Sequence, residues 1–346
     1  MAQMRAVDIK NGTGPATSLH ITSLPKPTPS PGQALIKIKA FGLNRMDLLQ
    51  REGRYPVPPQ APKTLGVEFS GTIEEVNGDG GKEGFKAGDE VFGLAYGGAY
   101  AEWIVVSVRM ILKKPEHLSF VEAAGVPETW ITATQALYLI GEFAEGKSVL
   151  WHAGASSVSI AGIQLSRVGK ASNIYITAGS QEKIDFCTHE LGATAGFNYK
   201  TTDWASEILK ATDGKGVDII VDFVGAPYFQ NNLKVAAKDA RIVQLGFMGG
   251  SKLPEGVDIS GFLLKRVRYE GSSLRSRDEV YQGRLRDRLE EWVGLFGEDG
   301  KGEGKDGGGK GLKVYVDKVF KWEDVVEAHR YMEGDGSKGK IICTID

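Results

Sequence analysis

Apolar and polar residues alternate with a period of two in the first part of the chain. The segment 34–40 reads Ala-Leu-Ile-Lys-Ile-Lys-Ala and predicts a half-buried strand. Three more short strands are expected at 72–76, 89–93 and 100–106, and turns rich in glycine and proline separate them. Short strands with closely spaced turns are typical of a partly closed β fold, which we predict for residues 1–126.

From residue 127 onward, apolar runs alternate with stretches of helical periodicity. Strands are expected at 148–153, 173–177, 217–224 and 241–245, and helices at 158–168, 181–191 and 228–237. Repeated β–α units imply a parallel sheet with helices on both faces, and right-handed crossovers make such a sheet doubly wound. The expected fold class is therefore α/β, with this second domain covering residues 127–272.

A third pattern follows in the last part of the chain. Helices are predicted at 281–296 and 323–332, and a final strand at 340–344. Between the two helices, residues 297–311 contain eight glycines, four acids and three lysines. Because this segment has no apolar side chain to bury, we expect it to be a flexible, solvated insertion.

Composition and charge exclude several classes of protein. The chain has 42 basic and 44 acidic residues, a balance that predicts no nucleic-acid partner and no binding to anionic membranes. Two cysteines, Cys187 and Cys343, are too few for a four-thiolate zinc site or a disulfide framework. Sparse cysteine and the absence of a signal-peptide or membrane-spanning pattern lead us to expect a cytoplasmic protein.

The first β–α turn of the second domain is a candidate phosphate site, because backbone N–H groups at a helix start bind anions. The pattern G-x-G-x-x-G is met here only at its first position, Gly154, with Ser156 and Ser159 at the others. The predicted contacts to the cofactor pyrophosphate come from Gly154, Ala155, Ser156, Ser157, Val158 and Ser159, with the serine hydroxyls as extra donors. The alternative is a turn of small residues that packs a helix and binds nothing.

The end of the second strand bears on the choice of cofactor. NAD sites place an acid there to bind the ribose 2′-hydroxyl, whereas this strand ends Thr-Ala-Gly-Ser at 177–180. Ser180 and Lys183 suit a 2′-phosphate instead, which favours NADPH. Glu182 counts against this interpretation, and Lys183 taken alone is equally consistent with an ordinary solvated helix residue.

Six segments carry a resemblance to a known family. Residues 42–56 and 65–71 resemble quinone oxidoreductases of the medium-chain dehydrogenase/reductase superfamily, and 152–156, 177–181, 196–200 and 274–278 resemble most its p53-inducible subgroup. The resemblance runs from about residue 4 to 345. It implies a GroES-like catalytic domain built from 1–126 and 273–346, together with a Rossmann domain and a cofactor cleft.

The resemblance also implies which residues act. In zinc-dependent relatives a Cys and the His of a Gly-His-Glu motif bind the catalytic metal, but the matching positions here are Asn44 and Val67, so no metal is expected. The nicotinamide and substrate would lie near Asn44, Asp47, Tyr55 and Thr132. Asn44 and Tyr55 would donate hydrogen bonds, whereas Asp47 would orient its neighbours or only cap a helix.

The remaining implied contacts are to the cofactor. The adenosine 2′-phosphate would be held by Gly179, Ser180, Lys183 and Tyr199. The cofactor cleft would be lined by Phe223, Val224, Gly225, Leu245, Gly246 and Phe247. The nicotinamide half or the pyrophosphate would be reached by Leu274, Arg275 and Arg277.

The predicted function is metal-free reduction of a quinone by NADPH, through transfer of a hydride or of single electrons. Quinone carbonyls are already electrophilic, so the cofactor performs the difficult step and the protein orients the reactants. Two alternatives stay open: a zinc-free enoyl or alkenal reductase acting on α,β-unsaturated carbonyls, and an NADPH-binding protein with little turnover. The family analogy further predicts a homodimer through the sheet edge near residues 241–272.

Overall fold

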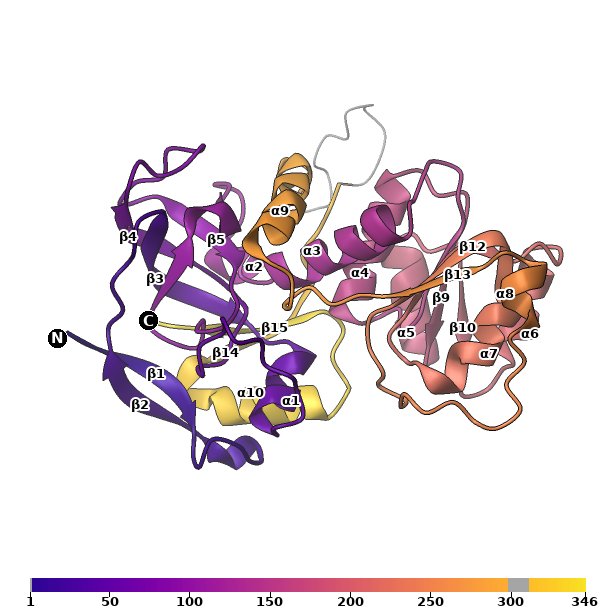
Figure 1. Cartoon of the computed structure of the whole chain (residues 1–346), viewed down its shortest axis with the longest axis horizontal. Coiled ribbons are helices and arrows are strands. Elements are labelled where there is room, and N and C mark those ends of the chain that lie inside the picture. The colour runs from indigo at the N-terminus through magenta and orange to yellow at the C-terminus, as the bar shows by residue number, and fades with distance from the viewer. Residues whose placement is uncertain (1, 298–310) are drawn as a thin grey trace. The chain divides into compact units, whose positions relative to one another are not determined.

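The computed structural model describes residues 2–297 and 311–346, which form two compact units (Figure 1). One unit, here called the terminal unit, contains the residues up to 131 together with 275–346. The other, the central unit, contains 132–274. The sequence places these boundaries at 126/127 and 272/273. Residues 298–310 of the expected glycine-rich insertion lie outside the described residues.

The terminal unit is built on a seven-stranded sheet to which both parts of its chain contribute. The strand order is β14 (Val316–Lys321), β15 (Lys340–Thr344), β3 (Gln33–Gly42), β4 (Glu68–Asn77), β5 (Glu90–Leu94) and β7 (Ile111–Lys113), with β6 (Trp103–Ser107) also paired to β3. Strands β1 (Gln3–Ile9) and β2 (Leu19–Pro25) form a separate antiparallel pair. Because β15 pairs antiparallel with β3, the last strand of the chain completes a sheet begun near its start.

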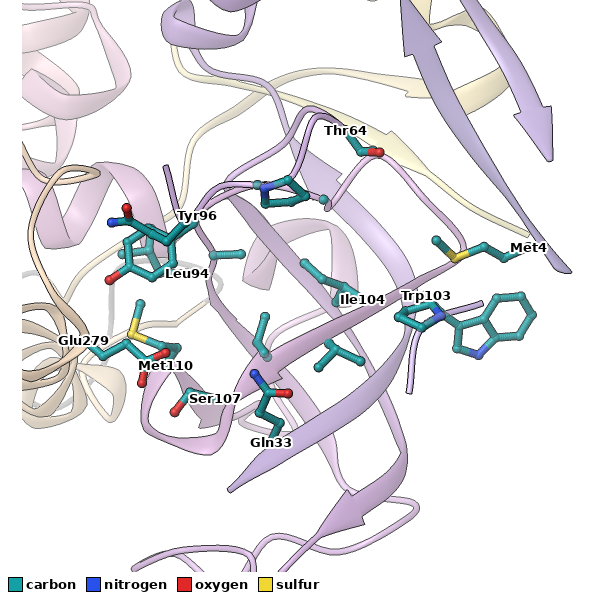
Figure 2. A pocket seen from close by; sticks show the side chains of 18 residues that line it. Met4, Gln33, Thr64, Leu94, Tyr96, Trp103, Ile104, Ser107, Met110 and Glu279 are labelled. Carbon is teal, nitrogen blue, oxygen red and sulfur yellow. The ribbon is translucent and has the colours of Figure 1, made fainter. Parts of the chain in front are cut away.

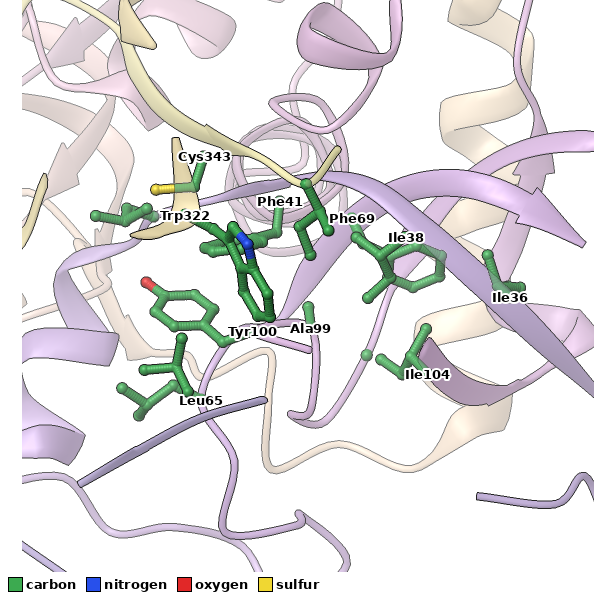
Figure 3. Close-up of a cluster of buried hydrophobic side chains, with 14 of the residues drawn as sticks. Ile36, Ile38, Phe41, Leu65, Phe69, Ala99, Tyr100, Ile104, Trp322 and Cys343 are labelled. Carbon is green, nitrogen blue, oxygen red and sulfur yellow. The ribbon is translucent and has the colours of Figure 1, made fainter. Parts of the chain in front are cut away.

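One face of this sheet carries the core of the terminal unit (Figure 3). The Phe41 and Tyr100 rings stack with their centroids 4.3 Å apart, and both side chains are fully buried. Cys343 of β15 lies opposite Phe41 in the strand register. The buried Trp322 joins the same cluster, so residues from both ends of the chain share one core.

Helices of the terminal unit begin or end close to the polar side chains described below. They are α1 (Arg45–Arg51), α2 (Phe120–Ala123), α3 (Pro127–Thr134), α9 (Glu279–Val293) and α10 (Val325–Glu333). Helix α3 runs across the boundary into the central unit. The apolar positions of α10 recur at helical spacing, so one face of the helix packs into the core.

The central unit is a six-stranded parallel sheet with the doubly wound order that the β–α repeats predict. The order is β10 (Ala195–Asn198), β9 (Ile174–Ala178), β8 (Val149–Trp151), β11 (Val217–Asp222), β12 (Ala236–Gln244) and β13 (Arg268–Gly271). The helices are α4 (Ser157–Val168), α5 (Gln181–Asp185), α6 (Trp204–Ala211), α7 (Ala226–Val235) and α8 (Ser260–Leu264). The direction of the strand order reverses between β8 and β11, which is where such sheets bind ligands.

Several element bounds differ from the sequence prediction, each for a local reason. The helix expected over 181–191 ends as an α-helix at Asp185 and continues as a π-helical turn over Phe186–Glu190. The strand expected over 217–224 stops at Asp222, because Asp222 Oδ1 accepts the N–H groups of Val224 and Gly225 and turns the chain. Residues 236–237, expected at the end of a helix, instead begin β12.

No helix in the described ranges is both long and apolar enough to cross a membrane.

Candidate functional site

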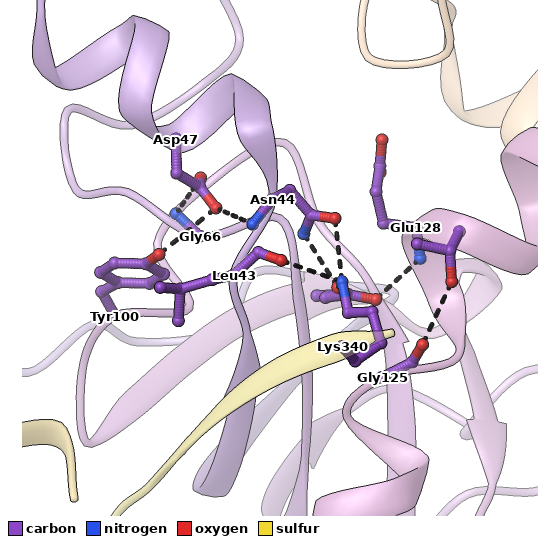
Figure 4. Close-up of polar contacts among 10 residues, drawn as sticks. Leu43, Asn44, Asp47, Gly66, Tyr100, Gly125, Glu128 and Lys340 are labelled. Carbon is purple, nitrogen blue, oxygen red and sulfur yellow. Dashed lines mark hydrogen bonds and ion pairs between the residues drawn. The ribbon is translucent and has the colours of Figure 1, made fainter. Parts of the chain in front are cut away.

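Asn44 lies between β3 and α1, is 9% exposed, and has its amide orientation fixed by two neighbours (Figure 4). Lys340 Nζ donates to Asn44 Oδ1 at 2.9 Å, and Asn44 Nδ2 donates to Glu68 Oε1 at 2.8 Å. An ammonium only donates and a carboxylate only accepts, so the oxygen and nitrogen of the Asn44 amide cannot exchange places. One N–H of Nδ2 donates to Glu68 Oε1, and the second has no hydrogen-bond partner among the described residues.

Glu68 on β4 and Lys340 on β15 form a buried ion pair that the sequence analysis missed. Lys340 Nζ also donates to the Leu43 carbonyl at 3.0 Å. The second oxygen of Glu68, Oε2, accepts the backbone N–H of Glu128 at 2.9 Å. Residue 42 must be glycine in this arrangement, since a Cβ there would overlap Glu68 Oε1.

Asp47 is fully buried, and both of its carboxylate oxygens accept hydrogen bonds from nearby backbone N–H groups, which is compatible with both sequence interpretations. Its Oδ2 accepts the Asn44 N–H at 2.8 Å, which caps the first turn of α1. Its Oδ1 accepts the N–H of Gly66 at 3.3 Å. Burial raises the pKa of the carboxyl to about 6, against the opposing effect of these hydrogen bonds. Asp47 therefore positions the Asn44 backbone.

A chain of buried polar groups continues from Asp47 to the outside of the terminal unit. Tyr100 Oη lies 3.3 Å from Asp47 Oδ2 and 3.2 Å from His329 Nε2, and Arg51 Nη1 lies 3.1 Å from His329 Nδ1. Arginine only donates, so Nδ1 accepts and Nε2 carries the imidazole proton. Burial and the Arg51 charge lower the pKa of His329 to about 3, so the ring is neutral. Each hydrogen bond in this series of side chains is therefore donated in the direction of Asp47.

Arg275 packs inside the terminal unit, against the loop that follows α1. Its Nε donates to the Tyr96 carbonyl at 2.6 Å and its Nη1 to Gln50 Oε1 at 2.7 Å. The guanidinium carbon lies 5.4 Å from the centre of the half-buried Tyr55 ring. Among the described residues, Arg275 Nη2 has no hydrogen-bond partner. Two of the three guanidinium nitrogens of Arg275 thus form hydrogen bonds within the protein.

The other residues expected near the nicotinamide lie on α3 and around Arg275. Thr132 is partly exposed and lies one turn after Glu128 on the same face of α3. Leu274 is buried, whereas Arg277 is partly exposed and lies over the Tyr281 ring at 4.5 Å. The structure therefore places Asn44, Asp47, Tyr55 and Arg275 in one unit, around shared charges.

In the central unit, the turn after β8 has the small residues and helix start that the sequence predicts. Ser156 caps α4, and its Oγ accepts the Ser159 N–H at 3.3 Å. Ser159 is fully buried and its Oγ donates to the His152 carbonyl at 2.8 Å. This hydroxyl therefore links α4 to β8, and the expected contact of Ser159 with the cofactor stays a prediction. Ser157 and Val158 are partly exposed, and Ala155 is buried.

Glycine at position 154 is required by packing. A Cβ on Gly154 would lie 2.8 Å from Ile176 Cβ on the neighbouring strand β9. The first glycine of the motif thus allows the turn to lie close to the sheet, while the start of α4 presents its N–H groups.

The residues expected at the 2′-phosphate come together at the ends of β9 and β10. A Cβ on Gly179 would lie 2.7 Å from Tyr199 Oη and 3.2 Å from Lys200 Cε, so both side chains cover Gly179. Ser180 caps α5 by accepting the Lys183 N–H at 3.3 Å. Lys200 is a second cation that the sequence analysis missed, although it directly follows Tyr199. Lys200 lies beside this neutral, glycine-containing turn, and Lys183 follows it on α5; cations in such positions would suit a phosphate dianion.

A buried polar chain supports the ends of β8, β9 and β11. Asp222 Oδ2 accepts Asn232 Nδ2 at 2.8 Å, Asn232 Oδ1 lies 2.8 Å from His152 Nε2, and His152 Nδ1 lies 2.9 Å from Thr177 Oγ1. Because Asn232 turns its oxygen toward the ring, Nε2 is protonated and Nδ1 accepts from Thr177. Burial lowers the pKa of His152, so the ring is neutral and structural.

The loops after β11 and β12 lie side by side at the edge where the strand order reverses. The Met248 N–H donates to the Phe223 carbonyl at 2.9 Å, and the Leu245 N–H donates to Asp222 O at 2.8 Å. Gly225 has a φ of +89°, and a Cβ there would meet the Gly250 carbonyl at 2.7 Å. Val224, Leu245 and Gly246 are partly exposed, and Phe247 is 56% exposed. An apolar edge of this kind suits a cofactor ring.

Two further features of the terminal unit lie apart from these residues. A cavity of about 360 Å³ is lined mainly by apolar groups, among them Leu94, Trp103 and Met110, and by none of the predicted site residues (Figure 2). Within the described residues, the only acids close enough to share a metal ion are Glu83, Asp287 and Glu290. Arg286 already pairs with all three of them.

Comparison with known families and proteins gives consistent matches over most of the chain. Residues 30–116 match the alcohol dehydrogenase GroES-like domain, and residues 157–290 match the zinc-binding dehydrogenase family. A zinc-type alcohol dehydrogenase-like protein of Schizosaccharomyces pombe is 30% identical over 342 residues, covering 92% of each chain. The quinone oxidoreductase of Pongo abelii is 27% identical, covering 99% of this chain and 98% of its own.

Solved structures with the same fold include an enoyl reductase and a protein in complex with NADPH. The CurK enoyl reductase is 26% identical with a TM-score of 0.82, covering 99% of both chains. A mycobacterial protein solved in complex with NADPH is 25% identical with a TM-score of 0.81, covering 99% of this chain and 100% of its own.

Proposed function

The chain belongs to the medium-chain dehydrogenase/reductase superfamily, and we propose that within this superfamily it is an NADPH-dependent, metal-free reductase of quinones. The α/β fold class, with a GroES-like domain and a Rossmann-like parallel sheet, is the one the sequence predicts. Oxidoreductase chemistry with a nicotinamide cofactor follows from the same family membership. The choice of a quinone and of NADPH is our proposal.

The observation that carries the proposal is the donor set around Asn44. Zinc sites in proteins use Cys, His, Asp or Glu ligands. Val67 has no donor atom, and Asn44 Oδ1 already accepts from the Lys340 ammonium at 2.9 Å. These positions do not fit a zinc ion, which favours a substrate whose carbonyl needs no Lewis acid. The quinone oxidoreductase among the similar proteins supports the same choice.

When bound, NADPH would supply the hydride, and the residues of the protein would bind and orient the cofactor. The N–H groups at the start of α4, around Ser157 and Val158, would hold the pyrophosphate. Lys183 and Lys200, with Tyr199 beside them, would hold the 2′-phosphate. The second N–H of Asn44 Nδ2 would orient the acceptor carbonyl. The buried Glu68–Lys340 pair keeps the Asn44 amide in one orientation.

One alternative has a specific observation in its favour. The CurK structure, at 26% identity over almost the whole chain, is an enoyl reductase. Reduction of an α,β-unsaturated carbonyl uses the same hydride and an orienting donor at the carbonyl oxygen. Such a substrate would bind at the same residues as a quinone, so only a comparison of activities separates the two proposals.

The test is a titration with NADPH and NADH, followed by NADPH oxidation with a panel of quinones and a matched panel of enones. We expect tighter binding of NADPH and faster oxidation with quinones. Faster turnover of the enones would favour the alternative. Tight binding of NADPH with no oxidation by either panel would contradict both and leave a cofactor-binding protein.

We also propose that the protein is a cytoplasmic homodimer. The two cysteines are both free and buried, which is compatible with a reducing compartment. Leu263 and Leu264 on α8, within the segment 241–272, are 82% and 70% exposed, and exposed leucines favour an interface there. Light scattering on the purified protein tests the dimer, and a monomer at micromolar concentration would contradict it.

A further inference from the structure

Glu128 stands in the first turn of α3, at the edge of the cluster around Asn44. Its backbone N–H donates to Glu68 Oε2, so the position of the residue is fixed by a buried carboxylate. The side chain is partly exposed and extends beyond the cluster, away from Lys340 (Figure 4). Within the described part of the chain its carboxyl makes no hydrogen bond or ion pair. A carboxyl group thus projects from the cluster without a partner.

Charged and titratable groups on five other segments of the terminal unit influence Glu128 electrostatically. They are Glu68 on β4, Lys340 on β15, Asp47 on α1, Arg275 in the loop before α9, and Tyr55 in the loop after α1. Two cations are therefore matched by two carboxylates before Glu128 is counted. A third ionised carboxylate would leave excess negative charge in a poorly solvated place. Burial, and next the Glu68 charge, raise the pKa of Glu128 to about 8.

We propose that Glu128 is the proton donor to the acceptor oxygen in this reductase, a role that rests on the proposed quinone reduction. The hydride from NADPH brings two electrons to the quinone and leaves a hydroquinone oxyanion. The Glu128 O–H bond then breaks, and an O–H bond forms on that oxyanion. The resulting carboxylate takes a proton from water, so one hydride and one proton are consumed for each hydroquinone formed.

Tyr55 is the competing donor, and its acidity counts against it. Burial, and next the Glu128 charge, raise the pKa of Tyr55 above the ordinary phenol value of 10.0. A general acid works best when its pKa lies near the working pH. A hydroquinone oxyanion is a phenolate, with a pKa of about 10, so proton transfer from Glu128 is downhill. Transfer from Tyr55 would be uphill.

The location of Glu128 also matches the positions expected for the reaction. Thr132, which the family resemblance places at the nicotinamide and substrate, lies one turn later on the same face of α3. Both side chains are partly exposed. A substrate oxygen that accepts from Asn44 would lie next to the turn of α3 that carries Glu128, because the Asn44 amide and the Glu128 N–H both donate to the Glu68 carboxylate.

The experiment compares the full-length wild-type protein with Glu128→Gln, Glu128→Asp and the exposed control Glu116→Gln. Steady-state kcat for NADPH oxidation by 1,4-benzoquinone is measured from pH 6 to 9.5, with NADPH affinity and melting temperature for each variant. We expect wild-type kcat to fall as pH rises through about 8. Glu128→Gln should lower kcat by about tenfold or more and remove this pH dependence. Glu128→Asp should restore part of kcat and part of its pH dependence, and Glu116→Gln should match the wild type in both.

Each outcome decides the proposal. A Glu128→Gln variant with wild-type kcat and the wild-type pH profile would contradict the donor role while leaving quinone reduction intact. A lowered kcat with an unchanged pH profile and no recovery in Glu128→Asp would indicate a positioning role and also contradict it. If no quinone supports NADPH oxidation by the wild-type protein, the proposed function itself is contradicted, and the donor role with it.

Discussion

At the scale of single residues, Lys340 joins three acceptors that no local pattern brings together. Its ammonium donates to the Leu43 carbonyl, to Asn44 Oδ1 and to Glu68 Oε1. Each acceptor removes part of the cost of burying the charge, and the Glu68 carboxylate balances it. Together with Glu68, this side chain fixes the orientation of the Asn44 amide.

Lys340→Met leaves Glu68 buried without its counter-charge, and removing one partner of a buried pair costs about 3–5 kcal/mol. We therefore expect a large loss of unfolding free energy in urea denaturation. The double variant Lys340→Met with Glu68→Gln should recover a substantial part of that loss, because no charge is left unpaired. Additive losses in the double variant would mean that the two side chains do not interact.

His329 predicts a dependence of stability on pH. Its pKa is held at about 3 in the folded protein, below the ordinary value of 6.5. Between pH 3 and 6.5, His329 is protonated in the unfolded chain but neutral in the folded protein. Stability is therefore lost as the pH falls from about 6.5 toward 3. The expected contribution is about 1.4 kcal/mol per pH unit for one group.

Unfolding experiments between pH 7 and 5 on wild type and His329→Gln isolate this contribution, since glutamine can both accept from Arg51 and donate to Tyr100. The stability advantage of the wild type should shrink on acidification. The same difference at both pH values would show that His329 is not held neutral by its surroundings.

At the scale of elements, helix α4 and strand β8 are joined by the serine that replaces a motif glycine. Ser159 Oγ donates to the His152 carbonyl, and Ser156 Oγ accepts from the first turn of the helix. The sequence matches the G-x-G-x-x-G pattern only at Gly154, and it leaves open a turn that binds nothing. In the structure these hydroxyls form hydrogen bonds within the protein, so under the proposed function the N–H groups at the start of α4 would bind the pyrophosphate.

Ser159→Ala should therefore lower stability by about 1–3 kcal/mol, because a buried carbonyl loses its partner. The affinity for NADPH should change by less than about twofold, since the hydroxyl does not reach the ligand. Thermal unfolding and fluorescence titration measure the two effects. A large loss of affinity at unchanged stability would contradict this account of the turn.

Under the proposed function, the ends of β9 and β10 would determine the preference for NADPH over NADH. Lys183→Ala and Lys200→Ala should each weaken NADPH binding by about tenfold, or ~1.4 kcal/mol, and leave NADH binding unchanged. Lys238→Ala, an exposed lysine of the same unit, is the matched control. Equal losses for both cofactors would mean that these lysines do not bind the 2′-phosphate.

At the scale of the whole molecule, the sequence predicted what depends on local periodicity. The parallel sheet, its β–α units and the small-residue turn after β8 follow from patterns within a few tens of residues. The Glu68–Lys340 pair does not, because 272 residues separate its members. The register of β15 against β3, and of β3 against β4, brings the pair together. Arg51 and His329, 278 residues apart, were missed for the same reason.

The central claim is that this chain reduces quinones with NADPH and without a metal. The most direct measurement is the rate of NADPH oxidation by 1,4-benzoquinone before and after exhaustive dialysis against a chelator, with metal content determined for both samples. We predict turnover that is undiminished in the metal-depleted protein. Loss of the rate on depletion with recovery on adding zinc, or no oxidation in either sample, would contradict the claim.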